Sequence, residues 1–281
     1  MQKTPDNPLS PASVPGPAGA ADWRGSLAPL SRYWNIIAFK TYANLKRDID
    51  KTYLGTLWWV LEPVLTTAVL YVVFTYIQHT KTQAFIVFLL IGNVVYGHFS
   101  SSINTGAGAL IANAGLMQQV RLPKSLYPII AVCNLTWKFL FSLVVIFPML
   151  WLLHCPVSLP YLALPLLLAF QVFAVVGFSL PFAILMPFFQ DARTLLSTLL
   201  NVGFWISGIL FPIEMVPPAW RPWFYLNPAA TLIDGYRTVL IHAQWPVWGN
   251  FLGPLAICAA FWGAGILLMR RLGGKVTKLP L

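Results

Sequence analysis

The sequence predicts an all-α integral membrane protein with six transmembrane helices. A cytoplasmic amphipathic helix at the membrane interface precedes them, and two short re-entrant helices lie between spans five and six. The first observation behind this prediction is composition: of 281 residues, 58% are hydrophobic and only 9% are charged, whereas soluble domains are about 25% charged. Recurring apolar segments and an asymmetric distribution of Lys and Arg are the other two. A chain this apolar requires the bilayer as its solvent.

Residues 1–30 are predicted to form a disordered tail. Six prolines lie there among Ala, Ser and Gly, and no apolar periodicity is present. Such a segment cannot bury enough apolar surface to fold. It also lacks the apolar core of a signal peptide, so we expect the N-terminus to stay in the cytosol.

Residues 31–56 are predicted to form an amphipathic helix in the cytoplasmic headgroup layer. Apolar and polar residues recur at spacings of three and four, which places them on opposite faces of a helix. The apolar face comprises Tyr42, Leu45, Ile49 and Tyr53, and the polar face comprises Lys40, Asn44, Arg47 and Lys51. A basic polar face suits anionic headgroups. A soluble surface helix is the alternative, but a hydrophobic span begins immediately afterwards, which favours the membrane interface.

Six apolar segments within residues 57–270 are predicted to form the permease domain. Most approach or exceed the ~20 residues that cross a hydrocarbon core of about 30 Å. They are Leu57–Ile77, Ala84–Ile103, Tyr127–Leu153, Tyr161–Met186, Leu195–Phe211 and Phe251–Met269. The fifth is the shortest, and the fourth contains Pro165 and Pro181, which predict a kink. Residues 271–281 are the predicted cytoplasmic tail.

The basic residues orient these spans. With the N-terminus inside, fourteen Lys and Arg residues fall on the cytoplasmic side, and three, Lys81, Arg221 and Arg237, fall outside. Cytoplasmic loops carry such an excess in membrane proteins. Both termini are therefore predicted to be cytoplasmic. The same rule accounts for the net charge of +10 without any nucleic acid partner.

Residues 211–246 do not resemble a simple loop. They are rich in Trp, Phe and Tyr and interrupted by five prolines before residue 230. No apolar piece is long enough to span. Aromatic residues at this density favour a pair of short re-entrant or interfacial helices at the outer face. An ordinary aromatic belt is the alternative.

No enzymatic site is visible in the sequence. The chain has no phosphate-binding loop, since Gly273-Gly274-Lys275 is followed by Val276 rather than Ser or Thr. Neither a catalytic set nor a metal-ligand cluster is evident, so no metal site is predicted. Two charged residues lie inside spans, Glu62 and Lys138. A structural pair between them is one interpretation, and a proton relay would need more titratable groups.

Several motifs, in order along residues 31–270, resemble those of ATP-binding cassette (ABC) export permeases, in particular the branch that exports O-antigen and capsular polysaccharides. The first is Arg47-Asp48-Ile49, then Tyr53-Leu54-Gly55-Thr56-Leu57-Trp58 and Leu61-Glu62-Pro63. The others are Asn113-Ala114-Gly115-Leu116 with Arg121-Leu122-Pro123, Gln190-Asp191-Ala192-Arg193, Ser207-Gly208-Ile209-Leu210-Phe211-Pro212, and Asn227-Pro228 ahead of Arg237. The pattern departs mildly where Lys51-Thr52 replaces an Arg before the aromatic residue.

The resemblance implies a half-transporter in the bacterial inner membrane. It would pair with a second copy of itself and with two copies of a soluble ABC ATPase, which would bind ATP and Mg. Its substrate would be a lipid-linked polysaccharide. Exporters of a drug or lipid, and a membrane-embedded glycosyl- or acyltransferase, are the alternatives.

The resemblance also implies positions for three sets of functional residues. The candidates for coupling to the ATPase are Asn113, Leu116, Met117, Val120, Arg47 and Lys51. The candidates for the channel and its substrate are Glu62, Trp58, Tyr71, Phe74, Tyr96 and Phe99. The candidates for an outer gate are Pro217, Trp220, Trp223, Asn227 and Arg237. Sugar rings stack on aromatic faces without a fixed register, which suits a sliding polymer, although packing in the core or against lipid is an alternative role for each aromatic residue.

Overall fold

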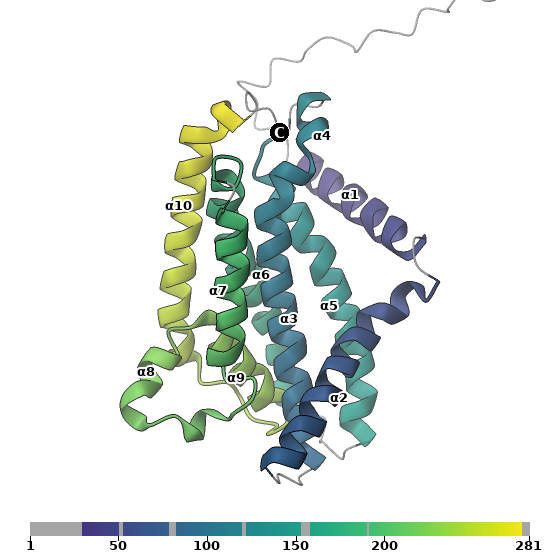
Figure 1. The fold of residues 1–281 in the computed structure, drawn as a ribbon, viewed down its shortest axis with the longest axis vertical. Helices are drawn as coiled ribbons and strands as arrows, with labels where there is room; N and C mark the ends of the chain where they lie inside the picture. Colours follow the sequence, from purple (N-terminus) through teal and green to yellow (C-terminus); the bar gives the residue numbers. More distant parts are fainter. Residues whose placement is uncertain are drawn as a thin grey trace, which may run out of the picture. The chain divides into compact units, whose positions relative to one another are not determined.

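The computed structural model describes residues 30–50, 53–78, 83–119, 122–152, 158–189 and 191–276 (Figure 1). The predicted disorder of residues 1–29, together with Lys51, Val120 and the last five residues, lies outside these ranges. Contacts divide the chain into a unit of residues 1–36 and a unit of residues 37–281. All contacts discussed below lie within the second unit.

The predicted amphipathic helix is α1, Leu30–Asp50. A short 3-10 turn, Gly55–Leu57, then leads directly into α2, Trp58–Gln78. Gly55 has φ +52°, in the left-handed region that glycine adopts without steric cost. The glycine therefore lets the chain turn from the polar segment into the first span.

Within the described part of the chain, five helices are long and apolar enough to cross a membrane. In chain order they are α2, α3 (Gln83–Ala112), α5 (Leu126–Leu152), α6 (Leu164–Leu185, preceded by a 3-10 turn Leu159–Ala163) and α10 (Leu252–Val276). Pro165 falls in the first turn of α6, where its missing N–H breaks no helical hydrogen bond. These helices confirm that the chain is an all-α, multi-pass membrane protein.

Three expected spans differ in length from the observed helices. The sixth continues to Val276 instead of ending at Met269, so residues 271–276 of the predicted cytoplasmic tail are helical. The second continues to Ala112 instead of ending near Ile103, because the Ser, Asn and Thr residues beyond position 99 stay helical. The fifth corresponds to α7, Ala192–Ile206, whose 15 residues extend only ~22 Å at about 1.5 Å per residue. It stops early because Gly208, with φ +71°, turns the following apolar residues back into the core.

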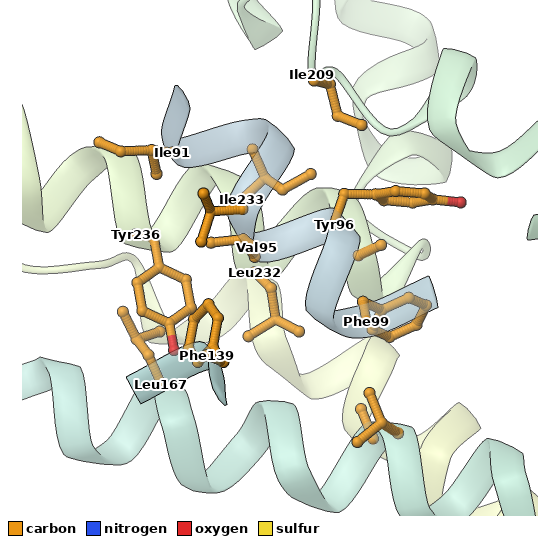
Figure 2. Packing of buried hydrophobic residues seen from close by; sticks show 14 of the residues in the cluster. Ile91, Val95, Tyr96, Phe99, Phe139, Leu167, Ile209, Leu232, Ile233 and Tyr236 are labelled. Carbon is orange, nitrogen blue, oxygen red and sulfur yellow. The ribbon is translucent and has the colours of Figure 1, made fainter. Parts of the chain in front are cut away.

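The central helix of the second unit is α3. It packs against α2, α5, α6, α7 and α9, while α10 packs mainly on α6 (Figure 1). In the most apolar 18-residue stretch of α3, 67% of residues are buried, against only 6% in that of α2. Ile91 and Val95 of α3 meet Leu232 and Ile233 of α9 in one apolar cluster, which also contains residues of α5 and α6 (Figure 2).

The segment between α7 and α10 contains the expected short helices. These are the 3-10 turns Ile213–Met215 and Pro218–Trp220, then α8 (Arg221–Phe224), α9 (Pro228–Leu240) and the 3-10 turn Trp248–Phe251. Asn227 caps α9 by accepting from the backbone N–H of Ala229 at 3.0 Å. The helix is buried along most of its length. Its insertion into the outer leaflet stays a prediction.

Candidate functional site

One face of α3 stays open although the helix is central. Gly97, Ser101 and Thr105 are exposed, and Asn93 and Asn104 are half-buried. Residues four apart lie one above another on a helix, so these positions form one polar stripe. All of them are uncharged and hydrogen-bonding or small. A bilayer would not favour this surface, which suits a hydrated path or a polar ligand.

The first cavity flanking this stripe has a volume of about 290 Å³ and lies between α2, α3 and α5. Its walls combine uncharged polar groups, two charged groups and aromatic rings. The lining residues are Trp59, Glu62, Pro63, Thr66, Asn93, Val94, Gly97, His98, Ser101, Leu135, Lys138, Phe139 and Ser142. A site of this composition can hydrogen-bond to hydroxyl groups while an aromatic face packs against a ring.

The wall formed by α2 depends on a proline and two polar contacts. Pro63 has no N–H, so the carbonyl of Trp59 loses its partner within the helix. Ser142 of α5 supplies the missing donor, with Oγ 2.9 Å from the Trp59 oxygen. On the α3 side, Asn93 Nδ2 donates to the Pro63 carbonyl at 3.2 Å and to Thr67 Oγ1 at 3.3 Å. The proline thus helps to join α2 to α5.

Lys138 has a different partner from the one suggested by sequence. Its ammonium group donates to the carboxylate of Asp48 on α1 at 2.7 Å, instead of to Glu62. It also lies 5.3 Å from the ring centroid of Trp59. Glu62 is exposed and lines the same cavity. The amphipathic helix therefore supplies the counter-charge to a lysine inside a span.

His98 closes the inner wall of the cavity as a neutral, fully bonded group. Gln171 Nε2 lies 2.7 Å from Nδ1, which must accept because the amide nitrogen can only donate. Nε2 then carries the proton and faces Thr136 Oγ1 at 3.3 Å. The Thr136 hydroxyl in turn donates to the carbonyl of Val132 at 2.9 Å. These contacts account for the imidazole as a structural group.

A second cavity of about 340 Å³ adjoins the stripe on its α7 side. Asn93, Gly97 and Ser101 line both cavities, so the two meet on the face of α3. The remaining walls are Tyr96, Ser100, Asn201, Phe204 and Trp205. The Tyr96 hydroxyl donates to the carbonyl of Leu200 on α7. Together the cavities form a polar path with aromatic walls and few charges.

The outer gate candidates fall into two groups. Pro217, Trp220 and Trp223 are exposed, in and around the turn that contains α8. Asn227 and Arg237 instead tie α9 to the rest of the chain. Asn227 donates to Ser207 Oγ at 2.9 Å.

Arg237 is buried and donates only to backbone carbonyls. Nη1 lies 2.6 Å from the Gly208 oxygen, and Nη2 lies 2.8 Å from the Ile209 oxygen and 2.9 Å from that of Phe88. Its guanidinium also stacks on the Phe88 ring, 3.3 Å from the centroid. One side chain thus holds α3, α9 and the turn after α7 together, which is a structural position for a residue considered as a gate.

The channel candidates are similarly dispersed. Glu62 lines the first cavity and Tyr96 the second. Phe99 is buried in the apolar core, and Tyr71 and Phe74 pack against it. Trp58 begins α2 and is 43% exposed. Only the first two of these six side chains therefore line a described cavity.

Asn113, Leu116 and Met117 of the coupling candidates lie on or next to the short helix α4, Ala114–Gln119. Arg47 lies instead in the last turn of α1, where it donates to Asn44 Oδ1 at 3.2 Å. Met117 is buried against Tyr127, Ile184 and other residues of this chain, so its side chain is not presented to a partner. Leu116 is half-buried, whereas Gln118 and Gln119 are exposed. The apolar face of α4 therefore anchors the helix, and any ATPase would meet its polar face.

Sequence reasoning missed the residues that build the cavity walls. Ser142 and Asn201 were not singled out, Trp59 was expected only as an anchor at the membrane interface, and Asn93 and Ser101 were read only as part of a span. A usable signal was present, since Asn93, Gly97, Ser101 and Thr105 repeat every four residues inside an apolar segment. That spacing predicts one polar helix face.

The chain was compared with known proteins. The family model described as ABC-2 type transporter matches residues 38–241. The chain is 27% identical over 214 residues to an O-antigen export system permease protein, RfbA, of Klebsiella pneumoniae, covering 76% of this chain and 83% of the relative.

Two further relatives show similar levels of identity. RfbA of Myxococcus xanthus is 23% identical over 77% of this chain and 84% of its own length. The polysialic acid transport protein KpsM of Escherichia coli is 27% identical over 80% of this chain and 90% of its own length. The matched region contains both cavities, α4 and the Arg237 contacts. The chain belongs to the ABC-2 type transporter family.

Proposed function

We propose that the chain is the membrane subunit of an ABC exporter that moves a lipid-linked polysaccharide, of the O-antigen or capsular type, outward across the bacterial inner membrane. Family membership supports the transport role. The names of the relatives, an O-antigen export permease and a polysialic acid transport protein, support the polysaccharide. ATP hydrolysis is assigned to a separate soluble subunit.

The observation that carries this proposal is the junction of the two cavities on α3. Their shared residues, Asn93, Gly97 and Ser101, are uncharged and small. Such groups offer hydrogen bonds to hydroxyls at many positions, while Trp59 and Trp205 offer aromatic faces. A polymer of sugars can therefore slide along this face of α3, because successive sugars can form similar contacts without one fixed register.

The proposed assembly contains two copies of this chain and two ATPase subunits, with both termini in the cytosol. The polar stripe of α3 supports a second copy, because a path exposed on one chain has to be enclosed before it can exclude lipid. The ATPase would bind at the end of the molecule that carries α4. The segment from α8 to α9 would approach the outer leaflet, because aromatic residues such as those in this segment are enriched at membrane interfaces.

Deletion of the gene for this chain in its source strain tests whether the exported substrate is a polysaccharide. We expect surface polysaccharide to disappear and lipid-linked polymer to accumulate inside the cell. Normal surface glycan, with altered drug or lipid efflux, would instead support the alternative substrate class.

A matched pair of variants tests the path itself. Ser101→Phe places a bulky ring where the cavities meet, while Leu267→Phe adds a similar ring on the exposed side of α10. Export should fall sharply in the first variant and stay normal in the second, with equal abundance of both proteins. Equal export would exclude the α3 face as the route.

A further inference from the structure

A third hollow lies between α1 and α5, on the other side of Trp59. This groove has a volume of about 500 Å³. Its walls are apolar or aromatic except for one lysine. The lining residues are Tyr42, Leu45, Lys46, Ile49, Trp59, Trp137, Leu140, Phe141 and Val144.

The chemistry of the groove suits a long hydrocarbon chain attached to an anionic group. Tyr42, Trp137 and Val144 are 66%, 59% and 63% exposed, so the groove is open along its length. Lys46 is its only charged lining residue and belongs to the amphipathic helix. A lysine beside an apolar trough can pair with a phosphate while its stem covers apolar surface.

Trp59 lines both this apolar groove and the polar cavity. Its ring meets Phe141 edge-on, with centroids 5.8 Å apart. On the cavity side, Lys138 lies 5.3 Å from the same ring. An amphipathic molecule lying across Trp59 would therefore contact both hollows, the groove that contains Lys46 and the cavity that contains Lys138.

We propose that the groove and the cavity together bind the lipid-linked end of the transported saccharide. The hydrocarbon chain lies in the groove, the phosphate that joins it to the glycan lies beside Trp59, and the first sugar enters the polar cavity. This inference rests on the proposed function and adds the place on the chain where the substrate is recognised. A fatty or isoprenoid chain fits equally, since the groove selects for hydrocarbon.

The polar lining of the cavity suits the hydroxyl groups of a sugar, which can bond to Asn93, Ser101 and Thr66 around it.

Site-specific photo-crosslinking in the source strain identifies the occupant. Benzoylphenylalanine is placed at Val144 in the groove or at Leu267 on α10, which is 50% exposed and lines none of the three hollows. Adducts are analysed by mass spectrometry before and after mild acid, which cleaves sugar phosphates. We expect glycan-bearing lipid at position 144 and only phospholipid at position 267. Phospholipid alone at both positions, in cells that still export polymer, would overturn the proposal.

Two substitutions test the groove by function. Val144→Trp fills it, and Lys46→Gln removes its charge, with Leu267→Trp and Lys40→Gln as matched controls outside the lining. Export should fall about tenfold with each groove variant, the order expected for a steric or charge change in a substrate site. ATPase association and abundance should not change.

The same variants separate the two proposals. If polysaccharide is the substrate but the groove is not its site, both groove variants will export normally while the deletion strain does not. If the deletion strain keeps its surface glycan, the proposed function itself fails. Full export by Val144→Trp in a strain whose glycan depends on this chain therefore excludes only the groove.

Discussion

Two basic side chains lie among the helices of this protein, and they are stabilised in opposite ways. Arg237 is 6% exposed and donates to three backbone carbonyls of neighbouring elements. Lys138 is 23% exposed and forms an ion pair with Asp48 of the amphipathic helix. One cation is neutralised by fixed dipoles, and the other by a charged side chain on a separate surface element.

The difference teaches which region is rigid and which can move. Carbonyls of Phe88, Gly208 and Ile209 cannot leave without unfolding a helix end or a turn, so α9 is fixed to α3. An ion pair with a partly exposed carboxylate can open at modest cost, because water replaces the lost contact. Movement of α1 against α5 would therefore need little energy. That contact borders both the polar cavity and the apolar groove.

The largest effect is expected at Arg237. Arg237→Met removes the Arg237 donors from the buried turn carbonyls of Gly208 and Ile209 and leaves α9 without its bond to Phe88, which should lower the free energy of unfolding by about 3 kcal/mol. Gly92→Ala should act similarly, because a Cβ at that position would lie 2.5 Å from Nη2 of the arginine. Thermal unfolding of the purified protein in detergent measures both.

Arg221 provides the control for this prediction. It also donates to two carbonyls, those of Val216 at 3.0 Å and Glu214 at 3.1 Å, but it is only half-buried. Water can satisfy both oxygens in Arg221→Met, so a loss of about 1 kcal/mol or less is expected. Equal losses for the two arginines would contradict the rigid assignment of α9.

A smaller effect on stability, with a larger one on transport, is expected at the ion pair. Lys138→Met and Asp48→Asn should each cost about 1 kcal/mol, since both side chains are partly exposed. Export should nevertheless fall, because α1 would no longer be held against α5. The exchanged pair, Lys138→Asp with Asp48→Lys, should restore part of the export. Failure of any rescue, with both proteins folded, would mean that the lysine acts alone.

The proline in α2 allows a sharper test in the same region. Ser142→Ala should cost about 1 kcal/mol, because the Trp59 carbonyl then has no donor. In a Pro63→Ala background the N–H of residue 63 can supply that bond, and the cost should largely vanish. A double-mutant cycle on unfolding free energies measures the coupling. Strict additivity would show that the serine does not replace the proline's missing donor.

Sequence predicted the helices well and their partners poorly. Length and apolarity locate α2, α5, α6 and α10, because hydrocarbon thickness imposes both. The partner of Lys138 depends on the tilt of α1, which no local spacing encodes, so Glu62 was considered instead of Asp48. Arg237 was considered as part of a gate, and its structural role was missed. Its hydrogen bonds go to backbone atoms, which leave no trace in side-chain patterns.

The sequence analysis did not predict the two cavities on α3, for a related reason. Ser100 and Ser101 were read only as part of an apolar span, whereas they line the two cavities on one side of α3. Hydropathy averages over all sides of a helix, but a path occupies one side. Conversely, the apolar residues after Gly208 were predicted to belong to the fifth span. The left-handed backbone conformation of Gly208 instead turns them into the core. Backbone geometry, and not hydropathy, sets the end of α7.

The smallest expected effect concerns Asp234, which lies one turn before Arg237 on α9. Burial raises the pKa of this carboxyl, while the hydrogen bond from the Tyr225 hydroxyl at 3.0 Å and the charge of Arg237 oppose the shift. A raised pKa means that the folded state favours the protonated acid. Below the unfolded pKa of about 3.9, Asp234 is protonated in both the folded and the unfolded state, so its ionisation does not change the free energy of unfolding. As the pH rises through the raised folded pKa, the free energy of unfolding decreases. Asp234→Asn mimics the protonated form, so its melting temperature should equal that of the wild type at acidic pH and slightly exceed it at pH 7. Melting curves from about pH 3, below the unfolded pKa, to about pH 8 measure the difference. A variant less stable than the wild type at neutral pH would show that the ionised carboxylate supports Arg237, and that α9 is held by an ion pair after all.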